Sequence, residues 1–198
     1  MTAVSFIPAH PSLPITSFVC EGTGEGAEAW CHRCGTAGSL NDSVATFLAA
    51  SIACYADNER YQASREGALS IKDCREHACG FRSVFYAGQS FGNKNSLDPQ
   101  DMALTQDLEA LPKSRYFFLY YPEKIATSAL YEAGWALILG KPSIYITSAA
   151  KDLPFLLREA HQAFNPPLVK VFECADAAAA CHRISGAKDA LFQFQSLQ

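Results

Sequence analysis

A single acidic residue, Glu132, lies inside an apolar segment that has the length of a helix. The segment Thr127–Leu139 reads TSALYEAGWALIL and carries no other charged side chain. Most of such a helix must be buried or must face a pocket. A carboxylate that is partly withdrawn from water can stabilise, or attack, an oxocarbenium ion at a ribose C1′. These residue types therefore predict a carboxylate that acts on a glycosidic bond.

The alternative explanation of Glu132 is that it favours the positive end of the helix dipole and has no chemical role. A glutamate with that role usually lies on a solvated face, and this helix offers little solvated face. No capping box supports the alternative either, because neither Thr127 nor Ser128, the two candidate N-caps, is followed three residues later by Glu or Gln.

The elements around this helix predict one βαβ unit. An aromatic run of strand length, Arg115–Tyr121, precedes the helix, and a second strand is predicted at Ser143–Thr147. A crossover between parallel strands is right-handed. The amino end of the helix then follows the carboxyl end of the first strand, which is the edge where open parallel sheets bind ligands.

The rest of the chain continues the alternation of strands and helices. Further strands are predicted at Phe81–Ala87, Leu168–Cys174 and Ile15–Cys20. Helices are predicted at Val44–Ala56, Asn58–Lys72, Met102–Leu111 and Leu153–Phe164, and from Asp176 onward. We therefore expect an irregular arm at residues 1–14, followed at residues 15–198 by one doubly wound α/β domain. Its mainly parallel sheet has about five strands with helices on both faces, as in flavodoxin-like and TIR-like folds.

Composition excludes several classes of function. The chain has 198 residues, 18% charged side chains and a net charge of −4, with no basic run. We therefore expect neither a nucleic acid nor a membrane among its partners. The amino-terminal residues lack the basic start of a signal peptide and are broken by prolines, so we expect a cytoplasmic protein whose eight cysteines are reduced.

The segment SALYEAGWALILGKPSIYI resembles the motif of the nucleoside 2-deoxyribosyltransferase superfamily. Glu132, Gly134 and Ala136 match its E-x-G-x-A helix, and Gly140–Pro142 match the G-K-P that follows. The longer run Phe81–Cys174 is similar to bacterial TIR-like domains that cleave NAD. The sequence departs from the transferases in two ways: no Asp ends the strand before the Glu helix, and FYAGQSF lies too near that strand to be the first strand.

This resemblance implies that Glu132 is the catalytic carboxylate of an N-glycosidase. Both departures favour NAD as the substrate, with release of nicotinamide and no need for a cofactor. The first alternative is deoxyribosyl transfer between nucleosides with Glu132 as nucleophile. The second is a non-catalytic nucleotide sensor or assembly module. The TIR-like resemblance also implies a homo-oligomer and a role in bacterial defence.

Several residues near the same edge are candidates for a nucleotide pocket. They follow two neighbouring strands or lie within one helical turn of Glu132. These substrate-binding candidates are Tyr86, Gly88, Ser90, Phe91, Tyr121, Glu123, Ser128 and Trp135. Ser128 could instead be a plain helix cap, and Trp135 could belong to the core rather than stack on a base.

Two cysteine pairs have spacings that could hold one zinc ion. The pairs occur in CHRCG (Cys31, Cys34) and CREHACG (Cys74, Cys79). Four thiolates can ligate zinc tetrahedrally. The second spacing is unusual, so the alternative, which we favour, is that these thiols are separately packed or exposed and that the chain holds no metal.

Overall fold

The computed structural model describes residues 46–52, 54–78, 84–94, 100–163 and 167–192. The helices and strands within these ranges are β1 Thr46–Ala50, α1 Asn58–Ala78, β2 Val84–Phe85, α2 Gln100–Lys113, β3 Tyr116–Tyr121, α3 Ala129–Ile138, β4 Ser143–Thr147, α4 Phe155–Ala163, β5 Val169–Glu173 and α5 Ala177–Phe192. None of these helices is long and apolar enough to cross a bilayer.

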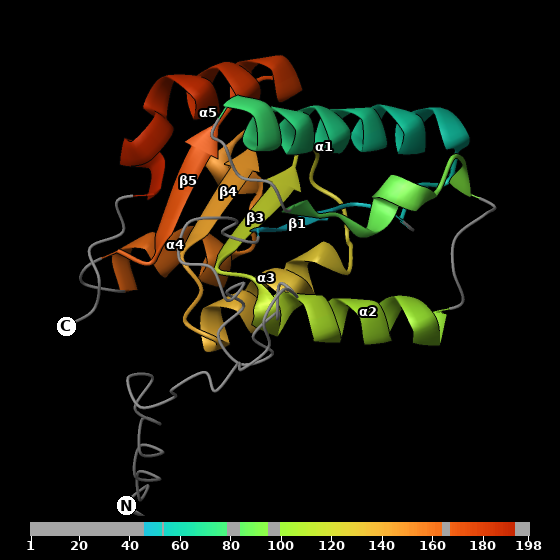
Figure 1. The fold of residues 1–198 in the computed structure, drawn as a ribbon, viewed down its shortest axis with the longest axis horizontal. Helices are drawn as coiled ribbons and strands as arrows, with labels where there is room; N and C mark the ends of the chain where they lie inside the picture. Colours follow the sequence, from blue (N-terminus) through green and yellow to red (C-terminus); the bar gives the residue numbers. More distant parts are fainter. Residues whose placement is uncertain (1–45, 53, 79–83, 95–99, 164–166, 193–198) are drawn as a thin grey trace, which may run out of the picture.

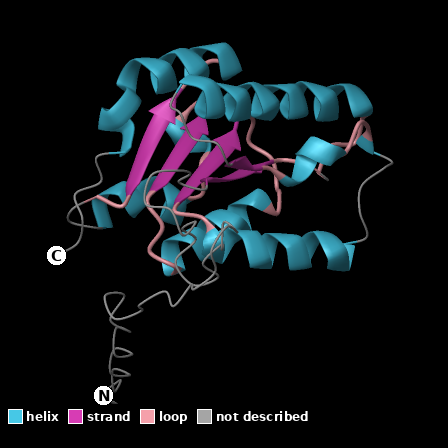
Figure 2. Ribbon diagram, in the orientation of Figure 1, coloured by secondary structure: helices cyan, strands magenta, loops and turns pink. Residues whose placement is uncertain are grey.

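The sheet confirms the predicted fold class. The five strands within the described residues are all parallel and lie in the order β2-β1-β3-β4-β5. Helices α1 and α5 cover one face, and α2, α3 and α4 cover the other (Figures 1 and 2). The strand order reverses between β1 and β3, so the crevice at this point is where a doubly wound fold binds its ligand.

The strands are apolar throughout because both faces of the sheet are covered. In β3, Phe117, Leu119 and Tyr121 belong to the core under α2–α4, while the alternate residues belong to the core under α1 and α5. This alternation follows from the two-residue period of a strand. All six residues of β3 are buried.

Strand β1 corrects our prediction of a helix at Val44–Ala56. Residues Thr46–Ala50 pair in parallel with both β2 and β3. Phe47 and Ala49 contribute to one core, and the residues that follow each of them contribute to the other. Because this strand is buried on both faces, its residues form a continuous apolar run. Periodicity alone does not distinguish such a run from a buried helix.

Strand β2 is the second strand of the described sheet, as predicted, but it is shorter than expected. It covers Val84–Phe85, and a 3-10 turn already begins at Ala87. The strand predicted at Ile15–Cys20 and the arm at residues 1–14 both lie outside the described residues.

The central βαβ unit lies where it was predicted. Helix α3 ends in a Schellman motif, in which the Gly140 N–H donates to the Leu137 carbonyl at 3.0 Å and the Lys141 N–H donates to the Ala136 carbonyl at 2.9 Å. Gly140 has a φ of +64°, a conformation that favours glycine. This turn delivers the chain into β4.

Helix α2 is longer than predicted at its carboxyl end. We expected Pro112 to stop it after Leu111, but the helix continues to Lys113. Proline in the last turn removes only one backbone hydrogen bond. The Lys141 ammonium then donates to the Pro112 carbonyl at 2.7 Å, which satisfies one of the carbonyls left free at a helix end.

Candidate functional site

Helix α3, which follows the loop after the carboxyl end of β3, buries Glu132. The helix begins at Ala129, and Glu132 lies in its first turn with only 7% of its surface exposed. Ala129, Ala133 and Ala136 are fully buried on the same helix, and their small side chains allow α3 to pack closely on the sheet. The dipole explanation of Glu132 assumed a solvated side chain, and this condition is not met.

The environment of Glu132 favours the protonated carboxyl group. Burial, assisted by the negative charge of Asp107, raises its pKa to about 8. A hydrogen bond with the Ser128 side chain lowers the pKa but does not offset the other two effects. Glu132 therefore holds a proton over most of the neutral range, as carboxyl groups that serve as general acids do.

Asp107 on α2 is a second carboxyl group in this region, and our sequence analysis missed it. Burial raises its pKa to about 6. Its Oδ1 atom is buried, and no described residue makes a hydrogen bond to it. Because Asp107 loses its proton at lower pH than Glu132, the pair holds one negative charge and one proton between about pH 6 and about pH 8.

The sequence contains a pattern that indicates Asp107 if the buried face of α2 is assigned differently. The apolar positions of α2 in the sequence are Met102, Leu104, Leu108 and Leu111, but only Leu111 is buried, and each of the other three is about half exposed. The residues that turn inward are instead Ala103, Asp107, Ala110 and Leu111. These residues recur at helical spacing, and an aspartate on such a stripe is the anomaly that indicates a site.

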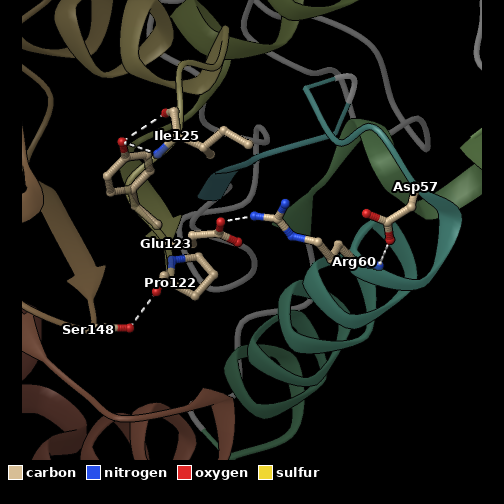
Figure 3. Close-up of polar contacts among 7 residues, drawn as sticks. Asp57, Arg60, Pro122, Glu123, Ile125 and Ser148 are labelled. Carbon is tan, nitrogen blue, oxygen red and sulfur yellow. Dashed lines mark hydrogen bonds and ion pairs between the residues drawn. The ribbon is translucent and has the colours of Figure 1, made fainter.

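The loop between β3 and α3 is held at three points (Figure 3). The Tyr121 hydroxyl donates to the Ile125 carbonyl and accepts from the Ile125 N–H, both at 2.8 Å. Ser148 donates to the Pro122 carbonyl, and Glu123 forms an ion pair with Arg60 of α1. Tyr121 and Glu123, both pocket candidates, thus fix the loop that leads into the Glu132 helix. Tyr121 is itself buried.

The candidates after β2 face α1 rather than Glu132. Tyr86 is buried in the core under α1, and its pKa is raised by burial and then by nearby Tyr61. A side chain at Gly88 would collide with the Tyr86 ring. The Gly88 carbonyl accepts from Arg65 at 3.1 Å.

The remaining two candidates of this group lie in the same segment. The Phe91 carbonyl accepts from the Tyr61 hydroxyl at 3.0 Å, whereas Ser90 is exposed. The 3-10 turn Ala87–Ser90 packs on both α1 and α2. These residues therefore border the edge of the sheet, and their described polar contacts connect them to α1 and not to Glu132.

Trp135 belongs to an apolar cavity between α2 and α3. The cavity has a volume of about 260 Å³ and is lined by Leu108, Leu111, Pro112, Trp135, Ile138 and Leu139. Pro112 and Leu139 lie at the carboxyl ends of their helices, away from the edge that holds Glu132. Trp135 also packs against the core. This apolar lining offers no hydrogen-bond partner for a sugar or a phosphate.

The structure tests only one of the four cysteines proposed to bind zinc. Cys74 lies on α1, and its sulfur contacts the Cys181 carbonyl at 3.4 Å and the Ser185 hydroxyl at 3.3 Å, both on α5. Cys31, Cys34 and Cys79 lie outside the described residues. No group of three potential metal ligands occurs within the described ranges.

Comparison with known proteins supports the fold. No family model matches the sequence, and no curated protein matches it. Among solved structures, the chain is similar to the CMP N-glycosidase BcmB of Clostridium botulinum, with a TM-score of 0.51 and 15% sequence identity. The match covers 71% of this chain and 97% of BcmB. At this identity the likeness shows the fold, which is that of a single parallel α/β sheet.

Proposed function

We propose that this protein hydrolyses the N-glycosidic bond of a nucleotide, with Glu132 as its catalytic carboxyl group. The observation that carries the proposal is the burial of Glu132 at the ligand-binding edge of a parallel sheet, close to the charge of Asp107. Enzymes that cleave glycosidic bonds commonly use two carboxyl groups, one protonated and one ionised. The fold shared with a CMP N-glycosidase makes CMP the first substrate to test.

The protonation states favour a nucleotide whose base is neutral. A neutral base must gain a proton as the bond from C1′ to nitrogen breaks. Protonated Glu132 can donate this proton while the Asp107 carboxylate stabilises the positive charge that develops on the ribose. Water then adds to C1′ and returns a proton to Glu132. The products from CMP are cytosine and ribose 5-phosphate.

NAD, which the sequence resemblance favoured, is the second candidate substrate. Nicotinamide leaves as a neutral molecule because bond cleavage neutralises its ring charge, so no proton donor is needed. This route requires Glu132 in its ionised form. The raised pKa of Glu132 therefore favours NAD cleavage only on the alkaline side of about pH 8.

The dependence of rate on pH separates the two candidates. Hydrolysis of CMP requires an ionised Asp107 and a protonated Glu132, so kcat/KM should peak between about pH 6 and about pH 8. Hydrolysis of NAD should instead increase through about pH 8. We would measure the release of cytosine and of nicotinamide by chromatography over this range.

The test of the proposal is the substitution Glu132→Gln, assayed with CMP, with NAD, and with a deoxynucleoside plus a free base. We expect it to lower kcat by about 10³-fold on the accepted substrate. Glu109→Gln is the matched control, because Glu109 lies on α2 near Asp107 and its side chain is largely exposed. This control should keep full activity.

Other outcomes would identify another function. Base exchange without net hydrolysis would establish the deoxyribosyltransferase alternative, with Glu132 as the nucleophile. Ligand binding without turnover of any of the three substrates would favour a nucleotide sensor. Full activity of Glu132→Gln would exclude the mechanism proposed here.

A further inference from the structure

The outer surface of the α2–α4 layer is unusually apolar. Ile138 is 85% exposed, Leu156 77% and Tyr131 72%. All large hydrophobic residues that are strongly exposed in the described part of the chain lie on these three helices or directly after α3. They are Met102, Leu104, Leu108, Tyr131, Ile138, Leu139, Phe155 and Leu156. The layer formed by α1 and α5 lies on the opposite face of the sheet (Figure 1), and its described side chains contribute none of them.

Parts of this face are hollow and parts protrude. The apolar cavity between α2 and α3 opens on it, and Leu108, Ile138 and Leu139 contribute both to the cavity lining and to the exposed surface. Phe155 and Leu156 project from the first turn of α4. We propose that this apolar face associates with the same face of a second copy of the chain to form a two-fold symmetric dimer.

The extent of the face fits a dimer interface. A large apolar residue presents roughly 200 Å² when fully exposed. The eight residues, which are 45% to 85% exposed, together present on the order of 1,000 Å². A stable interface buries about 800 Å² on each partner. Monomeric proteins rarely leave a patch of this size open to water.

The charges on this face favour an identical partner over a charged one. Lys113 pairs with Glu109 on α2 at 3.8 Å, and Arg158 pairs with Glu159 on α4 at 2.8 Å. The exposed side chains of α3 carry no charge. In a two-fold interface only residues near the axis meet their own copies, and a face whose charges are paired internally presents little unpaired charge to repel an identical partner.

The test is the mass of the full-length protein in solution, measured by light scattering or sedimentation from about 1 to about 100 µM. We expect a dimer for the wild type and a monomer for Ile138→Asp. Because Ile138 is 85% exposed, this substitution leaves the core intact. Ala178→Asp is the matched control, since Ala178 is exposed on α5 in the opposite layer. The control should remain dimeric.

Two results would overturn the proposal. A monomeric wild type over the whole concentration range would mean that another part of the chain or another protein covers the face. A dimer that Ile138→Asp and Leu156→Asp both leave intact would place the interface elsewhere. Neither result depends on whether the protein cleaves a nucleotide, so this proposal and the proposed function can fail separately.

Discussion

The two helical layers of this protein differ in the apolar side chains that they expose. The α1/α5 layer exposes charged residues such as Glu66 and Arg183 to water, and the α2–α4 layer exposes Ile138 and Leu156. On the inner side, the first layer buries Arg75 completely, and the second buries Glu132. Both layers thus contain a buried ionisable group, but only the second also presents an apolar outer surface.

The contacts of the two buried groups explain what this difference means. The Arg75 guanidinium lies over the rings of Tyr116 and Phe118, at 5.7 and 5.3 Å from their centroids. These aromatic faces stabilise its charge. Glu132 is instead destabilised in its charged form by burial and by Asp107. We therefore regard the first layer as a scaffold and the second as the layer that binds ligand and partner. The predictions below test this division.

The largest effect should be on the pH dependence of stability after Glu132→Gln. The pKa of Glu132 rises from its ordinary 4.5 to about 8 on folding. Between these values the unfolded chain ionises while the folded chain does not, so the wild type loses stability as pH increases. The variant does not titrate there. The difference in free energy of unfolding, variant minus wild type, should therefore increase by on the order of 3 kcal/mol from about pH 5 to about pH 8.5.

Denaturant titrations of both proteins at these two pH values would measure this effect. A stability difference that does not change with pH would mean that Glu132 is ionised inside the folded protein.

A substitution in the scaffold layer should affect stability and spare the chemistry. Arg75→Ala removes a large, fully buried side chain, so the free energy of unfolding should fall by about 3 kcal/mol. The rate per folded molecule should not change. Thermal unfolding together with an activity assay normalised to folded protein would check both. A fall in kcat without loss of stability would contradict the division into scaffold and functional layers.

Asp107→Asn should affect the chemistry more than the fold. Removing the negative charge should lower the pKa of Glu132 and move the alkaline limit of the pH–rate profile to lower pH. We expect kcat/KM to fall by about 10-fold or more, since the developing ribose cation loses a stabilising charge. An unchanged alkaline limit would show that the two carboxyl groups do not interact.

The smallest effects should come from two matched glycines in helix interiors. At Gly67 on α1, an added Cβ would lie 2.5 Å from the Tyr120 hydroxyl oxygen, so Gly67→Ala should destabilise by about 1–3 kcal/mol. At Gly134 on α3, an added Cβ would meet no described atom within 4 Å. Gly134→Ala should therefore stabilise by about 0.5–1 kcal/mol. If denaturant titrations show that Gly67→Ala lowers the free energy of unfolding and Gly134→Ala raises it, the scaffold layer is the more tightly packed of the two.

The open space at Gly134 leaves one explanation of this glycine to test. A glycine inside a helix can permit close approach of backbone or ligand, and no described atom from outside the helix lies within 4 Å of an added Cβ. If Gly134→Ala impaired substrate binding without loss of stability, a ligand would be the reason for the glycine.

Local patterns predicted the central unit of the fold and failed where tertiary contacts decide. The unit from β3 to β4 was predictable because its signals lie close together in the sequence. Two apolar runs indicate the strands, and Gly140 indicates the end of the helix between them. Strand β1 was not, because a run buried on both faces has no polar side to reveal its period. Glu132 was conspicuous because it is the single charge in an apolar helix.

Asp107 was not predicted because the apolar residues of α2 suggested a different buried face. Leucines mark the apolar positions of α2, but the structure buries Leu111 and leaves Leu104 and Leu108 about half exposed. Pattern reasoning assumes that apolar residues face the core of the same chain. Where an apolar helix face lies on the surface instead, this reasoning assigns the buried and exposed faces the wrong way round. A buried polar residue on the other side of the helix is then predicted to be exposed.

The strand order has a consequence for how the chain folds. From β3 to β5, each strand pairs with the next one in sequence, so this half of the sheet can assemble by closing short loops. Strand β1 instead pairs with β3, across the whole of α1, β2 and α2. Contacts between residues so distant in sequence slow folding. We expect the carboxyl-terminal half to form first during refolding and β1 to insert last between β2 and β3, which would complete the edge that holds Glu132.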